Sequence, residues 1–309
     1  MNKLLSVMAL MLAFSAPVAG IAESVLPLAS KAEAPGRLTS SATGIKIVFH
    51  PAYQRVYALD QAAEPGRMES ILGELQGVYE FVQPKSAKDK DITKVHTQSL
   101  LDRTFLDPEK ETGPGAGPLY SGRLDEIARL AAGGAILAAE LAVAGEVVFG
   151  LIRPPGHHAS YDQAYGHTYL NNIAIAVRKL LDEKKIERAL IVDFDLHPGD
   201  GTESIFRDDR RVTYYWLPVE GDRTQQLETL EEYLKEATDY DILAVSAGFD
   251  RGKEDWGGIF EIEDFRTIGQ LLKGAAERNS QGKRFAVLEG GYNPQVLGKN
   301  VKAFLEGFE

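Results

Sequence analysis

Three short stretches of this 309-residue chain gather side chains that can bind a metal ion and move protons. They are RPPGHH at 153–158, VDFDLH at 192–197 and SAGFD at 246–250. Asp195, His197 and Asp250 can supply one nitrogen and two carboxylate oxygens to a divalent ion, which leaves a position open for water and substrate. His157 and His158 are adjacent and suited to proton transfer. These stretches predict metal-dependent hydrolysis.

Hydrolysis of an amide would need both the metal and the histidine pair. An amide carbonyl is a poor electrophile, so a Lewis acid has to polarise its oxygen while a base takes a proton from the attacking water. The amine also has to be protonated before the C–N bond breaks, which accounts for a second histidine beside the first. A carboxylate near each imidazole would separate their pKa values. We expect a small acid, such as acetate, and a free amine as products.

The elements that must position these residues alternate between short β-branched apolar runs and segments of helical period. Strands are expected at 45–49, 78–82, 147–152, 189–193, 212–217, 242–246 and 285–288. Helices are expected near 65–75, 122–144, 170–184, 224–238, 262–278 and 294–306. Apolar strands separated by helices predict one α/β domain, in which a mostly parallel sheet lies between two helical layers in a three-layer αβα arrangement.

The chemical residues follow the carboxyl ends of four predicted strands, where ligands bind in open parallel sheets. Each feature also has an ordinary structural explanation. A histidine pair can belong to a loop, Asp195 can cap a helix, and Asp250 can stand in a turn. Tyr292, which follows the strand at 285–288, can simply pack. The convergence of all four on one edge of a sheet favours a catalytic site.

Composition limits the partners and the ligands. The formal net charge is −11, the sequence pI is about 5.2, and no run is rich in Lys or Arg, which argues against nucleic acid and fits a cationic substrate better. The chain has no cysteine, which excludes disulfides, thiolate zinc sites and cysteine nucleophiles. Any metal must therefore be held by nitrogen and oxygen ligands.

The first residues predict export. Lys3 provides a short positive region, residues 4–14 are apolar but too few to span a bilayer, and Gly20-Ile21-Ala22 offers the small residues that a signal peptidase reads. The alternative is an amphipathic or buried first helix. We expect a periplasmic or secreted protein with no membrane span in the mature chain. The expected parts are a signal peptide at 1–22, an irregular arm at 23–43 and a catalytic domain at 44–309.

Four strings of residues, in this order, resemble the zinc-dependent histone deacetylase and acetylpolyamine amidohydrolase family, which has an arginase-like fold. The strings are RPPGHHA at 153–159, VDFDLHPGDGT at 192–202, SAGFD at 246–250 and EGGYN at 289–293. Weaker likenesses extend the resemblance over about residues 45–309, at His50-Pro51, 64–67, His96 and Asn171-Asn172. The domain at 44–309 is therefore expected to be deacetylase-like.

The resemblance assigns a role to each chemical residue. It implies one zinc ion per chain, with water as a fourth ligand and three protein ligands: Asp195, His197 and Asp250. It implies catalytic residues that transfer protons, orient the imidazoles and donate to the developing oxyanion: His157, His158, Asp193, Asp200 and Tyr292.

The chain departs from the family in residues that would line the substrate channel. Where relatives usually have Gly-Phe-Cys, with the Phe lining a narrow acyl-lysine tunnel, this chain has Gly166 and His167 followed by a threonine. Trp256 stands where relatives have a loop that faces the tunnel mouth, although it can also simply pack that loop. The segment 218–222 is shorter than its counterparts. We expect a wider and more polar channel.

The leading interpretation is an amide hydrolase that removes an acetyl or other short acyl group from acyl-lysine, an acylated polyamine or another small amine. Relatives often have a serine near a potassium ion where this chain has Trp216, so K⁺ binding is left open. A manganese ureohydrolase of the same fold would need two metals and further Asp-rich motifs. An exported metal-dependent solute-binding protein would have no need of His157, His158 and Tyr292 together.

Overall fold

A computed structural model of the protein describes residues 44–106 and 121–309. The signal peptide and the irregular arm expected over residues 1–43 lie outside the described residues. Both stay predictions, and so does the exported location. Within the described residues, no helix is long and apolar enough to cross a membrane.

In the described part of the chain, seven parallel strands form one sheet in the order β2-β1-β3-β7-β6-β4-β5. Their bounds are Ile45–Val48 (β1), Glu80–Val82 (β2), Val147–Gly150 (β3), Ala189–Asp193 (β4), Val212–Trp216 (β5), Ile242–Ala247 (β6) and Arg284–Leu288 (β7). Every residue of β4, β6 and β7 is buried, as expected for strands covered on both faces. All seven predicted strands are confirmed, with ends that differ by at most two residues.

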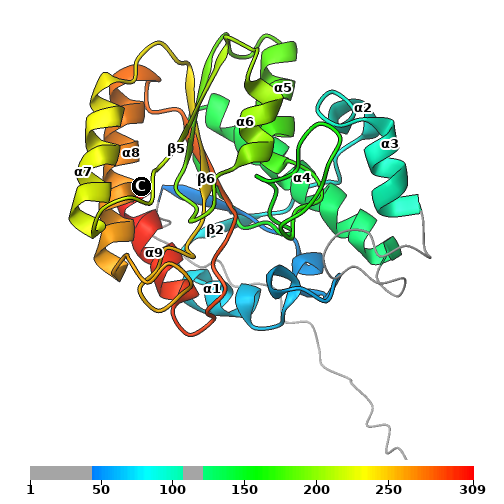
Figure 1. The fold of residues 1–309 in the computed structure, drawn as a ribbon, viewed down its shortest axis with the longest axis horizontal. Coiled ribbons are helices and arrows are strands. Elements are labelled where there is room, and N and C mark those ends of the chain that lie inside the picture. The colour runs from blue at the N-terminus through cyan, green and yellow to red at the C-terminus, as the bar shows by residue number, and fades with distance from the viewer. Residues whose placement is uncertain (1–43, 107–120) are drawn as a thin grey trace, which may run out of the picture. The chain divides into compact units, whose positions relative to one another are not determined.

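Helices cover both faces of the sheet, so the predicted three-layer αβα fold is confirmed (Figure 1). Helices α7, α8 and α9 lie on one side of the strands, and α4 and α5 lie on the other (Figure 1). The longer helices are Arg67–Leu75 (α1), Ser121–Val143 (α4), Asn172–Asp182 (α5), Arg223–Glu236 (α7), Ile262–Asn279 (α8) and Leu297–Phe308 (α9). All six were predicted from their periodicity.

Several short elements were not predicted. They are the helices Asp89–Ile92 (α2), Gln98–Leu101 (α3) and Asp200–Phe206 (α6), the 3₁₀ turns Pro51–Gln54 (η1) and Gln61–Ala63 (η2), and the π-helical turn Asp102–Leu106 (η3). Elements of three to seven residues span two turns or less, which is too short to show a helical period in the sequence.

The segment between β5 and α7 is as short as the sequence predicts. Strand β5 ends at Trp216, and α7 begins at Arg223 after the N-cap Asp222. The Asp222 carboxylate accepts from the backbone N–H groups of Thr224 and Gln225, and the Gln225 side chain accepts from the Asp222 N–H. This capping box fixes the start of α7 and keeps the connection close to the end of the sheet.

Four neighbouring strands bring the chemical residues to one edge of the sheet. In the spatial order β3-β7-β6-β4, their carboxyl ends lead into His157, Tyr292, Asp250 and Asp195, respectively. Because all of these strands are parallel, their carboxyl ends lie at the same edge. The topology thus joins stretches that are far apart in the sequence.

Candidate active site

Asp195, His197 and Asp250 offer ligand atoms that all lie within 4.8 Å of one another. The Nδ1 atom of His197 is 3.2 Å from Asp195 Oδ1 and 3.1 Å from Asp250 Oδ2. Both carboxylates are buried, whereas 40% of the His197 side chain is exposed. The three predicted metal ligands therefore form one cluster that is open to solvent on the imidazole side.

Backbone N–H groups hold both carboxylates in place. Asp195 Oδ1 accepts from the His197 N–H at 2.9 Å, and Asp195 Oδ2 accepts from the Gly290 N–H at 2.8 Å. Asp250 Oδ1 accepts from the Leu196 N–H at 3.0 Å. Asp250 Oδ2 is buried and has no hydrogen-bond partner, and its close contact is the ion pair with His197 Nδ1 at 3.1 Å. One buried carboxylate oxygen is thus left for another partner.

The surroundings of this cluster fit a divalent metal. A Cβ atom at Gly290 would lie 2.5 Å from Asp195 Oδ2 and 2.7 Å from Asp250 Oδ2, so only glycine leaves this space free. Burial, followed by the charge of Asp195, raises the pKa of Asp250 to about 7. The two adjacent carboxylates raise the pKa of His197 to about 10. Two buried carboxylates and an imidazole are a donor set that zinc accepts, and a cation would relieve their repulsion.

His157 lies against the metal-ligand cluster and is buried. Its Nδ1 is 3.0 Å from Asp193 Oδ2, which also accepts from the Tyr214 hydroxyl at 3.0 Å. Its Nε2 is 3.8 Å from Asp195 Oδ1. Burial alone would lower the pKa of His157, but the charges of Asp195 and Asp193 outweigh burial and raise it well above its usual value.

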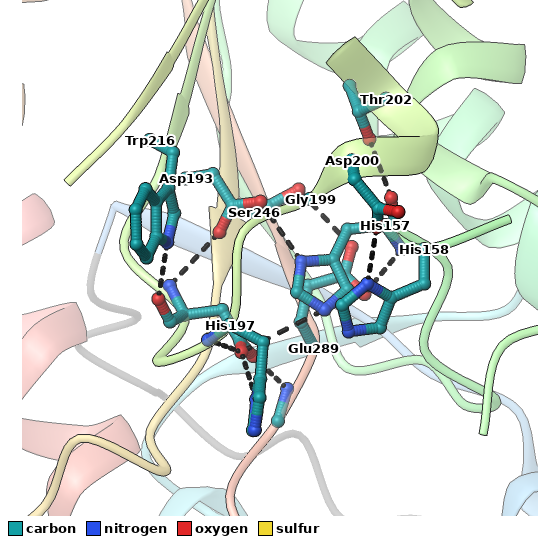
Figure 2. Close-up of polar contacts among 12 residues, drawn as sticks. His157, His158, Asp193, His197, Gly199, Asp200, Thr202, Trp216, Ser246 and Glu289 are labelled. Atoms are coloured by element: carbon teal, nitrogen blue, oxygen red, sulfur yellow. Dashed lines mark hydrogen bonds and ion pairs between the residues drawn. The ribbon is translucent and has the colours of Figure 1, made fainter. Parts of the chain in front are cut away.

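His158 is paired with a different carboxylate. Its Nδ1 is 2.7 Å from Asp200 Oδ1, and its ring centroid is 4.1 Å from that of His157 (Figure 2). Burial and then the charge of His157 lower the pKa of His158. The two imidazoles are therefore in contact, each has its own carboxylate, and their pKa values move in opposite directions.

Tyr292 lies over the same cluster from the end of β7. Its backbone N–H donates to Asp255 Oδ2 at 2.7 Å, and its ring stacks on Trp256 with centroids 4.1 Å apart. Burial, with the charges of Asp195 and Asp250, raises the pKa of Tyr292 well above its usual value. Its hydroxyl group therefore stays protonated and can donate a hydrogen bond.

The three predicted channel residues also lie beside these groups. Gly166 has a φ of 60°, and a Cβ atom there would lie 2.6 Å from the His158 ring, so a side chain would displace that imidazole. The His167 ring is 6.1 Å from the Tyr292 ring. Trp256 is 47% exposed, and its ring is 5.8 Å from that of His197. Gly166 therefore lies next to His158, His167 next to Tyr292, and Trp256 next to His197 and Tyr292.

Comparisons with known proteins identify the family. The family model of the histone deacetylase domain matches residues 61–218 and 215–308, which is most of the chain. The chain belongs to the histone deacetylase family. A probable deacetylase of Methanothermobacter thermautotrophicus is 32% identical over 307 residues, which cover 85% of this chain and 90% of the relative.

Other relatives of this histone deacetylase family member also have names that describe a hydrolase. A histone deacetylase-like amidohydrolase of Pseudomonas aeruginosa is 29% identical, covering 74% of this chain and 70% of that protein. The crystal structure of the HDA15 HD domain superposes with a TM-score of 0.71 at 22% identity, covering 87% of this chain and 90% of that one. The structural match supports the arginase/deacetylase-like fold, and the named relatives support a deacetylase or amidohydrolase activity.

The sequence did not predict that three further residues belong to the site: Tyr165, Glu289 and Arg251. The Tyr165 ring stacks on His158 with centroids 5.2 Å apart, and its hydroxyl donates to Asp200. A signal was present, because Tyr165 is an aromatic residue directly before the predicted channel residue Gly166. Tyr165 therefore fixes both His158 and its carboxylate.

Glu289 is a buried carboxylate behind the histidine pair. Its Oε2 accepts from the N–H groups of Gly156 at 2.6 Å and His157 at 3.2 Å, and its Oε1 accepts from the Ser246 hydroxyl at 3.2 Å. Burial raises the pKa of Glu289 to about 7. It is the first residue of the EGGYN string, in which the glutamate itself was given no role. Glu289 ties the ends of β3, β6 and β7 together.

Proposed function

We propose that this member of the histone deacetylase family is a zinc-dependent hydrolase that removes an acetyl or other short acyl group from an amine. The observation that carries the proposal is the contact between His157 and His158, each bonded through Nδ1 to its own carboxylate, beside the cluster of metal ligands. Amide hydrolysis needs a positioned group that can accept and donate a proton beside the metal, because water must lose a proton and the departing amine must gain one.

Asp195, His197 and Asp250 are the proposed zinc ligands. Zinc bound there would act as a Lewis acid toward the amide carbonyl and the attacking water. The proposal is supported by the nitrogen and oxygen donors, by the buried Oδ2 of Asp250 that makes no hydrogen bond and by the space that Gly290 leaves free. Backbone N–H groups orient both carboxylates, which favours a site that keeps its geometry during turnover.

We assign proton transfer to the histidine pair, oriented by Asp193 and Asp200. A carboxylate at each Nδ1 holds the proton on that atom and leaves Nε2 to act toward the substrate. The His158 side chain is the more accessible of the two, at 13% exposed against 4% for His157. We therefore propose that His158 exchanges protons with water and amine, while His157 lies between it and the ligand Asp195.

We assign the stabilisation of the oxyanion to Tyr292. Its hydroxyl is protonated, and its ring is held by Trp256 on one side and by the Asp255 carboxylate through the backbone. A donor held in this way needs no reorganisation when negative charge develops on the carbonyl oxygen.

We propose small, cationic or polar acylated amines as preferred substrates, ahead of acyl-lysine in folded proteins. His167 places a polar ring where an apolar wall would narrow the channel, and Trp256 offers an aromatic face to a cation or a methylene chain. The net charge of −11 favours the approach of cations.

We further propose that the protein is exported to the periplasm or secreted, on the basis of the signal-peptide pattern at 1–22. Cell fractionation of the tagged full chain, with N-terminal sequencing of the mature form, tests this. An uncleaved chain in the cytoplasm would contradict it.

The experiment that tests the activity measures metal content and acetate release on the same sample. We expect one zinc per chain and acetate release from a panel of acetylated diamines, acetylated amino sugars and acetyl-lysine peptides. Removal of zinc by a chelator should abolish release, and added zinc should restore it. Metal binding with no release from any substrate would favour the solute-binding alternative, and two metals per chain with release of urea would favour a ureohydrolase.

A further inference from the structure

Arg251 is a fully buried cation that directly follows the proposed zinc ligand Asp250. Its guanidinium makes five hydrogen bonds, and all of their acceptors are neutral oxygens rather than carboxylates. The acceptors are the backbone carbonyls of Asp195, Leu217 and Pro218 and the side-chain Oε1 of Gln226. A guanidinium has five N–H groups, so every one of them has a partner.

The carbonyl of the zinc ligand Asp195 is the main acceptor of these bonds. It accepts from Arg251 Nε at 3.2 Å, from Arg251 Nη2 at 3.0 Å and from the Trp216 indole N–H at 3.0 Å. A carbonyl oxygen has two lone pairs, and three N–H donors already occupy them. Arg251 and Trp216 therefore hold the backbone of Asp195 in place.

The carbonyl oxygens around Arg251 make a place that suits a cation. Three backbone carbonyls and one amide oxygen converge there from the segment after β4, from the segment after β5 and from α7. Backbone and amide carbonyl oxygens are among the ligands that hard cations accept in proteins. In this chain, the Arg251 guanidinium supplies the positive charge at that place.

A potassium ion does not fit these residues. The Asp195 carbonyl has no free lone pair, Trp216 presents an N–H donor where a hydroxyl oxygen would be needed, and the guanidinium of Arg251 fills the space between the carbonyls. The Arg251 side chain also lies against the Trp216 ring, 5.7 Å from its centroid. The K⁺ binding that the family resemblance left open is thus at odds with this structure.

Arg251 also balances the charge of the metal cluster. Burial lowers the pKa of Arg251, and the charges of Asp195, Asp193 and Asp250 oppose that effect. A buried charge that is not compensated is strongly destabilising. The guanidinium and the cluster of carboxylates thus compensate one another across the Asp195 backbone.

We propose that Arg251 is a built-in cation, which positions Asp195 and makes zinc retention independent of monovalent cations. The inference rests on the proposed zinc site. Arg251 does not reach the substrate, so it is a positioning residue: it acts through the carbonyl of Asp195 and through the connection from β5 to α7, whose first carbonyls it binds. Its removal should open a cavity lined by carbonyl oxygens, which a cation from solution can then enter.

The test compares zinc affinity in potassium chloride and in choline chloride at equal ionic strength, by competition with a chromophoric chelator. We expect the wild-type affinity to be the same in both salts. Arg251→Ala should bind zinc roughly 10- to 100-fold more weakly in choline chloride, the usual effect of losing a group that orients a ligand. Potassium, or guanidinium at a non-denaturing concentration, should restore a large part of that affinity.

Arg284 provides a matched control, because it is also buried and also donates to backbone carbonyls, those of Phe308, Glu309 and Gly282. It begins β7 and therefore stands at the opposite edge of the sheet. Arg284→Ala should lower the thermal unfolding midpoint and leave the zinc affinity of the folded protein unchanged in either salt. If Arg251→Ala does not fold, Arg251→Lys and Arg251→Gln replace it, and the lysine variant should retain zinc better because it keeps the charge.

Two results would overturn the inference while leaving the zinc site intact. One is a wild-type zinc affinity that rises with potassium, and the other is an Arg251→Ala variant that holds zinc as tightly as the wild type in choline chloride. A wild-type chain that binds no zinc would instead overturn the proposed function.

Discussion

The two sides of the site are built differently. On the side of the metal ligands, Asp195 accepts hydrogen bonds at both carboxylate oxygens and at its carbonyl, and its neighbours Asp250 and Arg251 are buried. On the channel side, Trp256 is half exposed and His167 Nδ1 is buried without a hydrogen bond, with Asp60 Oδ1 the nearest acid at 3.8 Å. The metal ligands are therefore held by more hydrogen bonds than the side chains of His167 and Trp256, so we expect changes at these two channel residues to have the smaller structural cost.

This contrast predicts that substitutions on the ligand side abolish activity. Asp250→Ala should lose zinc and acetate release together, because it removes the buried Oδ2, which makes no hydrogen bond and is left for the metal. Elemental analysis and the acetate assay on the same sample measure both. Asp209→Ala, which removes a partly buried carboxylate bonded to Arg178 and Arg211, should leave zinc and activity unchanged. Full zinc occupancy in Asp250→Ala would show that the ligand was assigned wrongly.

Tyr292→Phe removes one hydroxyl and should act on the transition state. We expect turnover to fall by about 10²- to 10³-fold with a modest change in KM, as for the loss of one oxyanion donor. Steady-state kinetics with an acetylated diamine separate kcat from KM. A loss confined to KM would make Tyr292 a residue that packs against the substrate.

His158→Ala should keep zinc and fold normally, but should lower turnover by at least ~10²-fold, the usual contribution of a positioned acid or base. The pH profile of kcat is the second measurement, because it should lose a titration that the wild type shows. Ser204→Ala is a suitable control, since Ser204 bonds only locally, to the Gly201 carbonyl in α6. An unchanged rate and profile would mean that the histidine pair is structural.

The loop that carries Tyr165 and His167 is anchored by a buried histidine. His96 Nδ1 lies 2.8 Å from the Ser160 carbonyl, and its Nε2 accepts from the Asn171 N–H at 2.8 Å. Burial lowers the pKa of His96 to about 4. The neutral ring donates at one nitrogen and accepts at the other, so protonation would break the bond to Asn171.

His96 should therefore make stability fall with acid. In the unfolded chain its pKa is about 6.5, so the unfolded state binds a proton first as the pH falls. The contribution is fully present above pH 6.5, decreases between pH 6.5 and about 4, and amounts to about 3 kcal/mol over that window. Urea unfolding at pH 7.5 and 4.5 should show a larger loss for wild type than for His96→Gln. Equal losses would contradict the assignment.

The smallest effect should come from the channel. His167→Phe should narrow the slot and raise the ratio of kcat/KM for an acetyl-lysine peptide over that for a free acetylated diamine, by roughly 10-fold. Tyr161→Phe is the control, because Tyr161 is 59% exposed in the stretch leading to that loop and should leave the ratio unchanged. A constant ratio in His167→Phe would mean that His167 does not line the channel.

Much of the fold could be predicted from the sequence because strands and long helices show a local period of hydrophobic residues. The strand at 189–193 was predicted to the residue, and the longer helices to within three residues at each end. The short helix α6, which begins at the carboxylate partner of His158, was not predicted, since seven residues are too few to show a period.

The sequence predicted those site residues whose side-chain type has a characteristic chemistry. Asp195, His197, Asp250 and the histidine pair have side chains that bind metals or protons, and their positions after strands imply that they meet. Glu289 and Tyr165 were not predicted because their roles depend on the atoms that they contact. Those contacts join residues that are distant in the chain, so the local sequence does not indicate them.

The sequence by itself determined the family, the order of the strands and helices along the chain, and the set of side chains available for hydrolysis. Only the tertiary structure decided how Arg251 is used, because its partners are backbone carbonyls of Asp195, Leu217 and Pro218. Every residue has a carbonyl group, so no pattern of residue types marks those that will converge. Their convergence arises when parallel strands bring distant segments to one edge, where a buried charge must find its acceptors.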